Sequence, residues 1–359
     1  MPQPSSSRSP SRPRRPLIGA NTERCIYCEG TRISREGKRY KKLETVQLWY
    51  CHDCDRVFTP QVVQGKRTPL KVILESLCLY YRGETRRRVA QRIKERFGLS
   101  VSPRTLSSWL AEYRELTTYA RLRSHALTLF TPHTLIRSTR LHHKQVYTYR
   151  LHQGKLALIL AEKQHEAFSP VADYLNDMAT SCPHALFQEE HRASQAANAF
   201  DLAGVEIGEK QNLAPRIAHL ALQAVTHNKR RHDELQRFML TTDSVTVAVE
   251  VPIYLTPKDI THMQQHLGFH IPITTAHTIT GHIDVLQIRN GRVHILDYKP
   301  GAIHERPIAQ LMVYALALSR RTGLRLFDFT CAWFDDRHYF EFYPLHVVHK
   351  RRSQRRYRG

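Results

Sequence analysis

The sequence predicts a multidomain chain with a small metal-stabilised domain, an all-α segment and a C-terminal α/β domain. Two CxxC doublets near the N-terminus predict the first part, and three amphipathic patterns over residues 69–118 predict the second. Strand and helix patterns that follow one another over residues 213–343 predict the third. A chain of 359 residues is long enough for two or three domains of ordinary size, each with its own core.

The chain is strongly basic, with a net charge of +22 from 54 Lys and Arg against 32 Asp and Glu. Such an excess is typical of proteins with a polyanionic partner, nucleic acid ahead of membrane. No apolar run approaches the roughly 20 residues that span a bilayer, and the start of the sequence has no apolar signal core. Seven Cys, an odd count, favour a reducing compartment. We therefore expect a cytoplasmic, nucleoid-associated protein that binds no membrane.

Both ends of the sequence are basic. Residues 1–19 consist mainly of Pro, Ser and Arg, with almost nothing to bury. Such a composition does not offset the entropy of ordering, so we expect a disordered basic arm, which either adds phosphate contacts or has no role. Residues 349–359 form a basic tail.

Residues 20–62 contain the two Cys doublets, Cys25 with Cys28 and Cys51 with Cys54. Their spacing lets two knuckles close on one tetrahedral ion, which predicts a zinc ribbon. Because so small a module has little core, structural Zn²⁺ is expected to stabilise its fold directly. The alternatives are four unrelated thiols or a dithiol redox pair, which two matched doublets disfavour. A ribbon alone does not say what it binds.

Residues 66–118 carry three amphipathic helical patterns that predict a helix-turn-helix domain. The first covers residues 70–81, the second about 85–97, and the third begins at Pro103 with Ser102 as its N-cap. A generic helical hairpin gives similar patterns and is the alternative. In a helix-turn-helix, the third helix would present four residues to a DNA groove: Arg104, Thr105, Ser107 and Ser108.

The ribbon and helices together resemble the N-terminal DNA-binding region of insertion-sequence transposases. The residues that carry this likeness are CIYCEG and WYCHDCDRVFT, followed by LYYRGETRRRVAQRIKERFGLSVSPRTLSSWL. In those families a zinc ribbon precedes a helix-turn-helix, and here the likeness covers roughly residues 24–115. The resemblance implies recognition of duplex DNA and does not by itself imply transposition.

Residues 119–210 give weaker signals, and we expect a mostly helical connecting region. Basic and aromatic residues mix over residues 141–152, which we interpret as a solvated helix rather than a face that tracks DNA. Cys182 is a lone thiol, expected in the core or in a loop rather than in catalysis.

Residues 211–348 contain the patterns of the α/β domain. We expect one long helix, three strands, a buried helix and two further strands, over residues 213–240, 245–255, 279–288, 292–299, 302–320, 327–334 and 338–343, respectively. Asn290-Gly291 lies between the second and third strands and predicts a tight hairpin turn.

Two carboxylates and a lysine in this domain have the pattern of a hydrolytic metal site. Asp297 and Lys299 are two residues apart on one strand, so their side chains point to the same face. Asp284 lies on the preceding strand, and the three together make a plausible cradle for Mg²⁺ and a hydrolytic water. The alternative is an exposed ion pair between Asp297 and Lys299, which contributes little to stability.

Three motifs in order resemble the PD-(D/E)xK nuclease superfamily, and specifically its RecB-like branch. They are GxxD at residues 281–284, DxK at 297–299 and QxxxY at 310–314, and the likeness covers about residues 213–345. It implies an α/β restriction-endonuclease-like fold with a mixed central sheet. It also implies that Asp284 and Asp297 ligate Mg²⁺ or Mn²⁺, with the Tyr298 carbonyl as a further ligand.

The resemblance assigns roles to the other motif residues. Lys299 would orient or activate the attacking water. Gln310 and Tyr314, at i and i+4 on one helix face, would position the site or the DNA backbone. The alternative for Gln310 and Tyr314 is a buried hydrogen-bonded pair that stabilises the helix.

One further metal ligand is left open. RecB-like nucleases commonly place a His on the helix before the first strand, and this segment offers His219, His227 and His232. None follows the Gly that often precedes the family's His, so we expect each to be a surface residue. Glu250, opposite the valines of its strand, is either an alternative acidic ligand or a structural residue.

These patterns predict a metal-dependent DNA endonuclease, in which the N-terminal half chooses the site and the C-terminal domain cuts, in mobile-element transfer, recombination or repair. No GxxxxGK phosphate loop occurs in the sequence, so unwinding requires a helicase partner, and a transposase is the other candidate partner. The first alternative is a non-catalytic DNA-binding regulator or transposition accessory protein with a nuclease fold. A DDE-type transposase needs carboxylates at wider spacing than Asp284 and Asp297.

Overall fold

The computed structural model of the chain describes residues 17–20, 22–188, 191–195, 200, 205–225, 230–273 and 276–349. Most of the expected basic arm and nearly all of the basic tail lie outside these residues. The described end of the arm is not disordered, because buried Ile18 belongs to strand β1 (Leu17–Ile18). The chain divides into two compact units, one within residues 1–74 and 220–231 and the other within 75–219 and 232–359.

The first unit contains a small sheet built around β3 (Thr45–Cys51). β2 (Ile33–Tyr40) and β4 (Arg56–Phe58) pair antiparallel with β3, and β1 pairs parallel with it. The core of this sheet is small: Cys25, Trp49, Cys51 and Phe58 form one cluster, and Ile18 and Val46 are buried as well. With so few apolar side chains to bury, the sheet needs a further source of stability.

Three helices follow at the predicted positions, α1 (Leu70–Tyr81), α2 (Arg86–Phe97) and α3 (Pro103–Glu112). The local signals explain the ends of α2 and α3. Thr85 and Ser102 accept hydrogen bonds from backbone N–H groups at the two N-termini, and Gly98 closes α2 in the left-handed conformation. The helical spans are confirmed, and their assignment to a helix-turn-helix stays a prediction.

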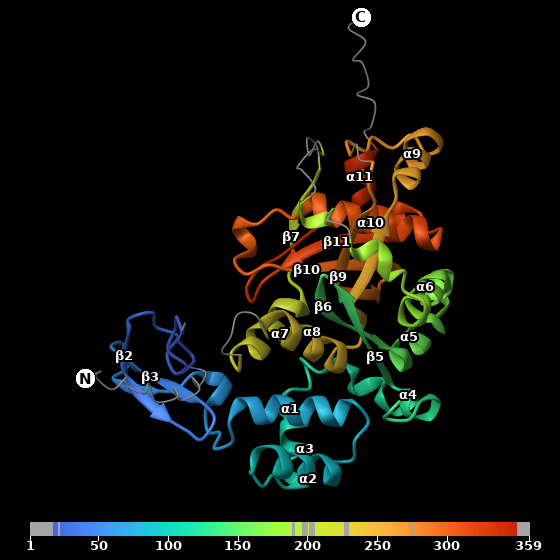
Figure 1. Cartoon of the computed structure of the whole chain (residues 1–359). Helices are drawn as coiled ribbons and strands as arrows, with labels where there is room; N and C mark the ends of the chain where they lie inside the picture. Colours follow the sequence, from blue (N-terminus) through green and yellow to red (C-terminus); the bar gives the residue numbers. More distant parts are fainter. Residues whose placement is uncertain are drawn as a thin grey trace, which may run out of the picture. The chain divides into compact units, whose positions relative to one another are not determined.

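The second unit contains an eight-stranded mixed sheet in the order β5-β6-β8-β9-β10-β11-β12-β7 (Figure 1). β10 and β11 run parallel, and the other neighbouring strands of this sheet run antiparallel. The strands are β5 (Ile136–His143), β6 (Gln145–His152), β7 (Gly208–Glu209), β8 (Thr246–Leu255), β9 (Ile279–Arg289), β10 (Arg292–Tyr298), β11 (Phe329–Phe334) and β12 (Tyr339–Phe342). The predicted α/β domain with a large mixed sheet is confirmed.

The β5–β6 hairpin at one end of this sheet shows that the interpretation of residues 141–152 as a helix is wrong. Residues 141–152 are strand, not solvated helix, since β5 and β6 pair with each other and β6 pairs with β8. Leu141, Tyr149 and Leu151 are buried, because alternate residues of the basic and aromatic run face the core. The region expected to connect two domains therefore contributes two strands to the sheet.

Helices cover the sheet. Helix α10 joins the parallel strands β10 and β11 and packs against β8, β10 and β11, and α6 packs beside it. The described α-helices that follow α3 are α4 (Arg123–Leu129), α5 (Gln153–Leu160), α6 (Ser169–Thr180), α7 (Leu213–Leu222), α8 (Arg231–Thr242), α9 (Pro257–His266), α10 (Ile308–Thr322) and α11 (Pro344–Val348). Among the described helices, none combines the length and apolar character needed to cross a bilayer.

Two further differences from the predicted elements concern helices. The long helix expected over residues 213–240 is divided into α7 and α8, and Gln223 and Ala224 form a turn after α7. Helix α9 was not predicted, although Thr256 and Asp259 form a capping box at its start. The hairpin between β9 and β10 is confirmed, because Asn290 and Gly291 both have the positive φ of a type I′ turn.

Candidate active site

The three sequence motifs of the C-terminal domain come together where β9, β10 and α10 meet. On β10, Asp297 Oδ2 lies 2.9 Å from Lys299 Nζ. Lys299 Nζ donates to Gln310 Oε1 at 3.5 Å, and Gln310 Nε2 donates to the Tyr314 hydroxyl at 2.9 Å. On β9, Asp284 Oδ2 accepts the backbone N–H of Tyr298 at 3.1 Å. A continuous polar chain therefore runs from a buried carboxylate to helix α10.

The first and third motifs also touch directly, through Gly281 and Tyr314. A Cβ atom built on Gly281 would lie 2.5 Å from Cε1 of the Tyr314 ring. The ring can lie there only because residue 281 has no side chain, so the two motifs form one packing unit. The Gln310–Tyr314 hydrogen bond is thereby held at the end of β9.

Gly281→Ala is therefore expected to destabilise the protein by about 1–3 kcal/mol, as overpacking of a well-packed site does. In a Tyr314→Ala background the same change should cost much less, because the clashing ring is gone. The measurement is chemical denaturation of the four proteins of this double-mutant cycle. Gly208→Ala is the matched control, since its added Cβ meets nothing closer than Lys210 Cε at 3.6 Å. Equal costs of Gly281→Ala in both backgrounds would contradict the packing argument.

A third carboxylate, Glu250 on β8, contributes to the charge of this site. It has φ of 53°, which is unusual for a residue other than Gly and is a form of strain that gathers at functional sites. Gln236 Nε2 donates to Glu250 Oε1 at 2.8 Å. Burial, together with repulsion from Asp284, raises the pKa of Glu250 and of Asp297 to about 8 each. The site thus gathers buried carboxyl groups that cannot all be ionised together without a cation.

His232 on α8 lies beside this site, and its side chain is 42% exposed, so it is a surface residue, as expected, that also contacts Asp284. Its Nδ1 lies 3.3 Å from Asp284 Oδ2, and its ring meets the Tyr298 ring edge-on at 5.0 Å. Burial acts to raise the pKa of Asp284, but the hydrogen bond and charge of His232 outweigh it and lower that pKa. Sequence reasoning set His232 aside because no Gly precedes it, and the start of a separate helix α8 at Arg231 brings its ring to Asp284.

The other two candidate histidines do not join the site in the part of the chain that the structure describes. His219 on α7 is exposed and lies 4.0 Å from Asp336. His227 falls outside the described residues. The acidic and imidazole groups that surround Asp284 are therefore Glu250, Asp297 and His232.

Comparison with protein families identifies this domain. The family model described as the PD-(D/E)XK nuclease superfamily matches residues 143–335, more than half of the chain. The chain belongs to the PD-(D/E)XK nuclease superfamily. No curated protein and no solved structure matches it. The matched range begins at the last residue of β5, so the nuclease match includes residues that we assigned to the connecting region.

Nucleases of this superfamily typically use divalent metal ions, and the donor set of the site fits one. Asp284, Asp297 and Glu250 offer the hard carboxylate oxygens that Mg²⁺ and Mn²⁺ prefer. Burial and then repulsion from Asp284 raise the pKa values of Glu250 and Asp297, and a bound divalent cation would relieve that repulsion. The individual ligands, including the Tyr298 carbonyl, stay predictions.

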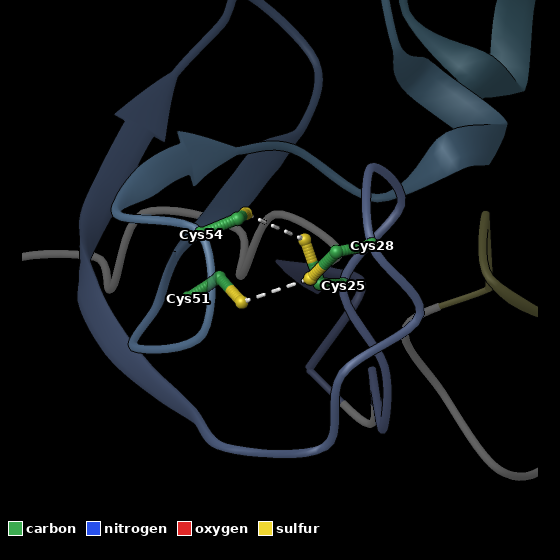
Figure 2. Close-up of side chains that lie close together, drawn as sticks. All are labelled: Cys25, Cys28, Cys51 and Cys54. Carbon is green, nitrogen blue, oxygen red and sulfur yellow. Dashed lines mark hydrogen bonds between the residues drawn. The ribbon is translucent and has the colours of Figure 1, made fainter.

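The four N-terminal cysteines of this nuclease-superfamily chain come together as predicted (Figure 2). Cys25 Sγ lies 3.7 Å from Cys54 Sγ, and Cys28 Sγ lies 3.6 Å from Cys51 Sγ. Ligands at Zn–S distances of about 2.3 Å in a tetrahedron stand about 3.8 Å apart, so the cluster fits one zinc ion. Burial acts to raise the pKa of Cys25, but backbone N–H groups of Tyr27 and Cys28 outweigh it and lower that pKa to about 7. At Cys28 a backbone N–H acts to lower the pKa, but burial and the neighbouring thiols outweigh it, and at Cys54 burial and the neighbouring thiols raise the pKa.

The two Cys doublets sit in matching turns. The residue after the second Cys of each doublet, Glu29 or Asp55, has a positive φ of 59° or 51°. The Tyr27 N–H also donates to Cys25 Sγ at 3.4 Å. Repetition of one backbone geometry around both pairs is what two zinc knuckles require.

The four residues predicted to reach DNA lie on the first turns of α3. Arg104 and Ser108 are exposed, whereas Thr105 and Ser107 are half-buried. The Ser107 hydroxyl accepts a hydrogen bond from Arg86 Nη1 at 3.0 Å, and the Thr105 N–H donates to Ser102 at 3.0 Å. Arg104 and Ser108 are therefore the more accessible members of this set.

Proposed function

We propose that the chain is a metal-dependent DNA endonuclease of the RecB-like branch that hydrolyses phosphodiester bonds. The observation that carries the proposal is the ion pair of Asp297 with Lys299, held against Gln310 and next to Asp284. A protein that only binds DNA has no need of this arrangement. The alternative, a DNA-binding regulator that retains the fold, predicts binding without cleavage.

The chain's own residues would orient the reaction. Burial acts to lower the pKa of Lys299, but Asp297 outweighs it and raises that pKa. A protonated Lys299 can orient the attacking water and stabilise developing negative charge, and it cannot accept the proton of that water. Asp297 and Gln310 hold its ammonium group from two sides. When bound at Asp284, Asp297 and Glu250, Mg²⁺ or Mn²⁺ would neutralise phosphoryl charge and supply a nucleophile at neutral pH.

The N-terminal part of the chain would recognise the DNA target. We propose that the four cysteines bind structural Zn²⁺ and that α1 to α3 act as a helix-turn-helix, with Arg104, Thr105, Ser107 and Ser108 toward the groove. The net charge of +22 supports a nucleic-acid partner. The transposase-like sequence supports a role with mobile elements, a helicase or transposase as partner, and a cytoplasmic, nucleoid-associated location.

Incubation of the purified protein with supercoiled plasmid and Mg²⁺ at low salt tests the nuclease proposal. The wild type should nick or linearise the plasmid, and Lys299→Ala should lower the rate by about 100-fold or more, the loss seen when one charge-stabilising donor is removed. Lys258→Ala, an exposed lysine on α9, is the matched control and should cut at the wild-type rate. Equal cutting by wild type and Lys299→Ala, or plasmid retardation without cutting, would reject the proposal.

A further inference from the structure

A second group of metal-ligating side chains lies outside the nuclease site. His143 ends β5, and Cys182 and His184 lie where the chain enters a short 3-10 helix (His184–Gln188). His143 Nε2 lies 2.9 Å from His184 Nδ1 and 3.8 Å from Cys182 Sγ. His143 and Cys182 are buried, whereas His184 is exposed. Three potential ligand atoms therefore converge on one small volume.

We propose that His143, Cys182 and His184 bind a transition-metal ion, with Zn²⁺ as the expected occupant. One thiolate and two imidazoles form a donor set that suits zinc and does not suit Mg²⁺. Tetrahedral zinc places two ligand nitrogens about 3.3 Å apart and a nitrogen and a sulfur about 3.6 Å apart. The distances of 2.9 and 3.8 Å lie within a few tenths of an ångström of these values. The exposed side, at His184, leaves room for water as the fourth ligand.

The surroundings of His143 fix its ring as a metal ligand requires. Its second ring nitrogen, Nδ1, lies 2.9 Å from His282 Nε2. In the tautomer that carries its proton on Nδ1, His143 donates to His282 and directs the lone pair of Nε2 toward the other two proposed ligands. Ligating histidines usually make such a second hydrogen bond. The His143 ring also stacks on Phe187, with centroids 4.1 Å apart, and His282 stacks on Tyr147 at 3.7 Å.

His282 connects the proposed zinc site to the strand that carries Asp284. His282 precedes Asp284 by two residues on β9, so the two side chains leave the strand on the same face. A metal bound through His143 would therefore tie the end of β5 and the Cys182–His184 turn to the strand that carries Asp284. This metal site is independent of cleavage, because none of its three ligands takes part in the proposed reaction.

The alternative is a chain of hydrogen-bonded neutral imidazoles, from His184 through His143 to His282, with no metal. The two arrangements differ in the role of Cys182, which a hydrogen-bonded imidazole chain does not need. They also differ in zinc stoichiometry, because the four-cysteine cluster is the other close group of thiol or imidazole ligands in the described residues.

Zinc titration of the full-length protein against a chromophoric chelator tests the proposal, with excess Mg²⁺ present to occupy the carboxylate site. The wild type should bind two equivalents, and His184→Ala and Cys182→Ser should each bind one. Cys28→Ser should also bind one, and its combination with His184→Ala should bind none. His142→Ala, an exposed neighbour on β5, is the matched control and should keep two.

Because His184 is exposed, its replacement by Ala is expected to leave the fold intact, so it decides the outcome even if Cys182→Ser does not fold. A wild type that binds one equivalent would overturn the proposal in favour of the imidazole chain. Two equivalents retained by folded His184→Ala would overturn it as well. Neither outcome bears on plasmid cleavage, so the nuclease proposal stands or falls separately.

Discussion

Asp297→Asn is expected to reduce phosphodiester cleavage by at least about a thousandfold while the protein stays folded. A bound metal would contribute several kcal/mol of charge stabilisation at the reacting phosphate. Each 1.4 kcal/mol of stabilisation that is lost slows the reaction about tenfold. Asn has the shape of Asp but lacks the negative charge that holds a divalent cation and the ammonium of Lys299. Plasmid cleavage in Mg²⁺ measures the effect, and Asp177→Asn, an exposed position on α6, should cut normally.

The same variant has a second expected result, in the pH dependence of stability. The pKa of Asp297 is raised to about 8 by burial and by Asp284, whereas an unfolded Asp titrates near its ordinary value. Between about pH 4 and pH 8 the folded wild type thus binds more protons than the unfolded chain, so its stability falls as the pH rises. Asp297→Asn removes this contribution, so its unfolding free energy in chelator should fall less steeply over that window.

Together these results separate catalysis from folding. Denaturant unfolding of wild type and Asp297→Asn at several pH values gives the two slopes, and addition of Mg²⁺ should flatten the wild-type slope most at high pH, where the carboxylates are ionised. Identical slopes in chelator would contradict the assignment of Asp297 as a buried carboxyl group with a raised pKa. Full cutting activity in Asp297→Asn would contradict its role in the reaction.

Local signals made parts of this fold predictable. Asn290-Gly291 encodes its turn because both residues tolerate positive φ, and Thr85 and Ser102 encode helix starts because their hydroxyls cap free N–H groups. Because side chains alternate along a strand, Asp297 and Lys299 share one face, and Asp297 Oδ2 lies 2.9 Å from Lys299 Nζ. Each of these inferences needs only a few neighbouring residues.

The parts that were missed depend on contacts between distant segments. The hairpin over residues 136–152 carries many basic and polar residues, and its alternation has meaning only once β8 lies beside it. His232 reaches Asp284 because α8 begins anew after a break, which no helical period foretells. The cluster of His143, Cys182 and His184 joins residues far apart along the chain. Only the fold brings them together.

Cys51→Ser, or removal of zinc by a chelator, is expected to unfold the small sheet of β1 to β4 and to leave the eight-stranded sheet folded. Cys25 and Cys51 are themselves half of the small core cluster, and Trp49 and Phe58 are the other half. Ile18 and Val46 are buried in the same sheet, and each of these four large apolar side chains contributes about 1.5–3 kcal/mol. Fixing the backbone costs about 1–2 kcal/mol for every residue, so this core cannot order the segment without the metal.

Zinc binding at such sites is worth about 10–16 kcal/mol in small zinc domains, enough to make folding depend on the metal. Amide hydrogen exchange measures the loss of folded structure at individual backbone N–H groups. In Cys51→Ser, the amides that pair β2 with β3 should exchange freely, while those between β9 and β10 keep their protection, since the two sheets lie in separate compact units. Cys331→Ser, a buried thiol in β11, should give the reverse pattern. Protected β2 and β3 amides in metal-free protein would show that the ribbon folds without zinc.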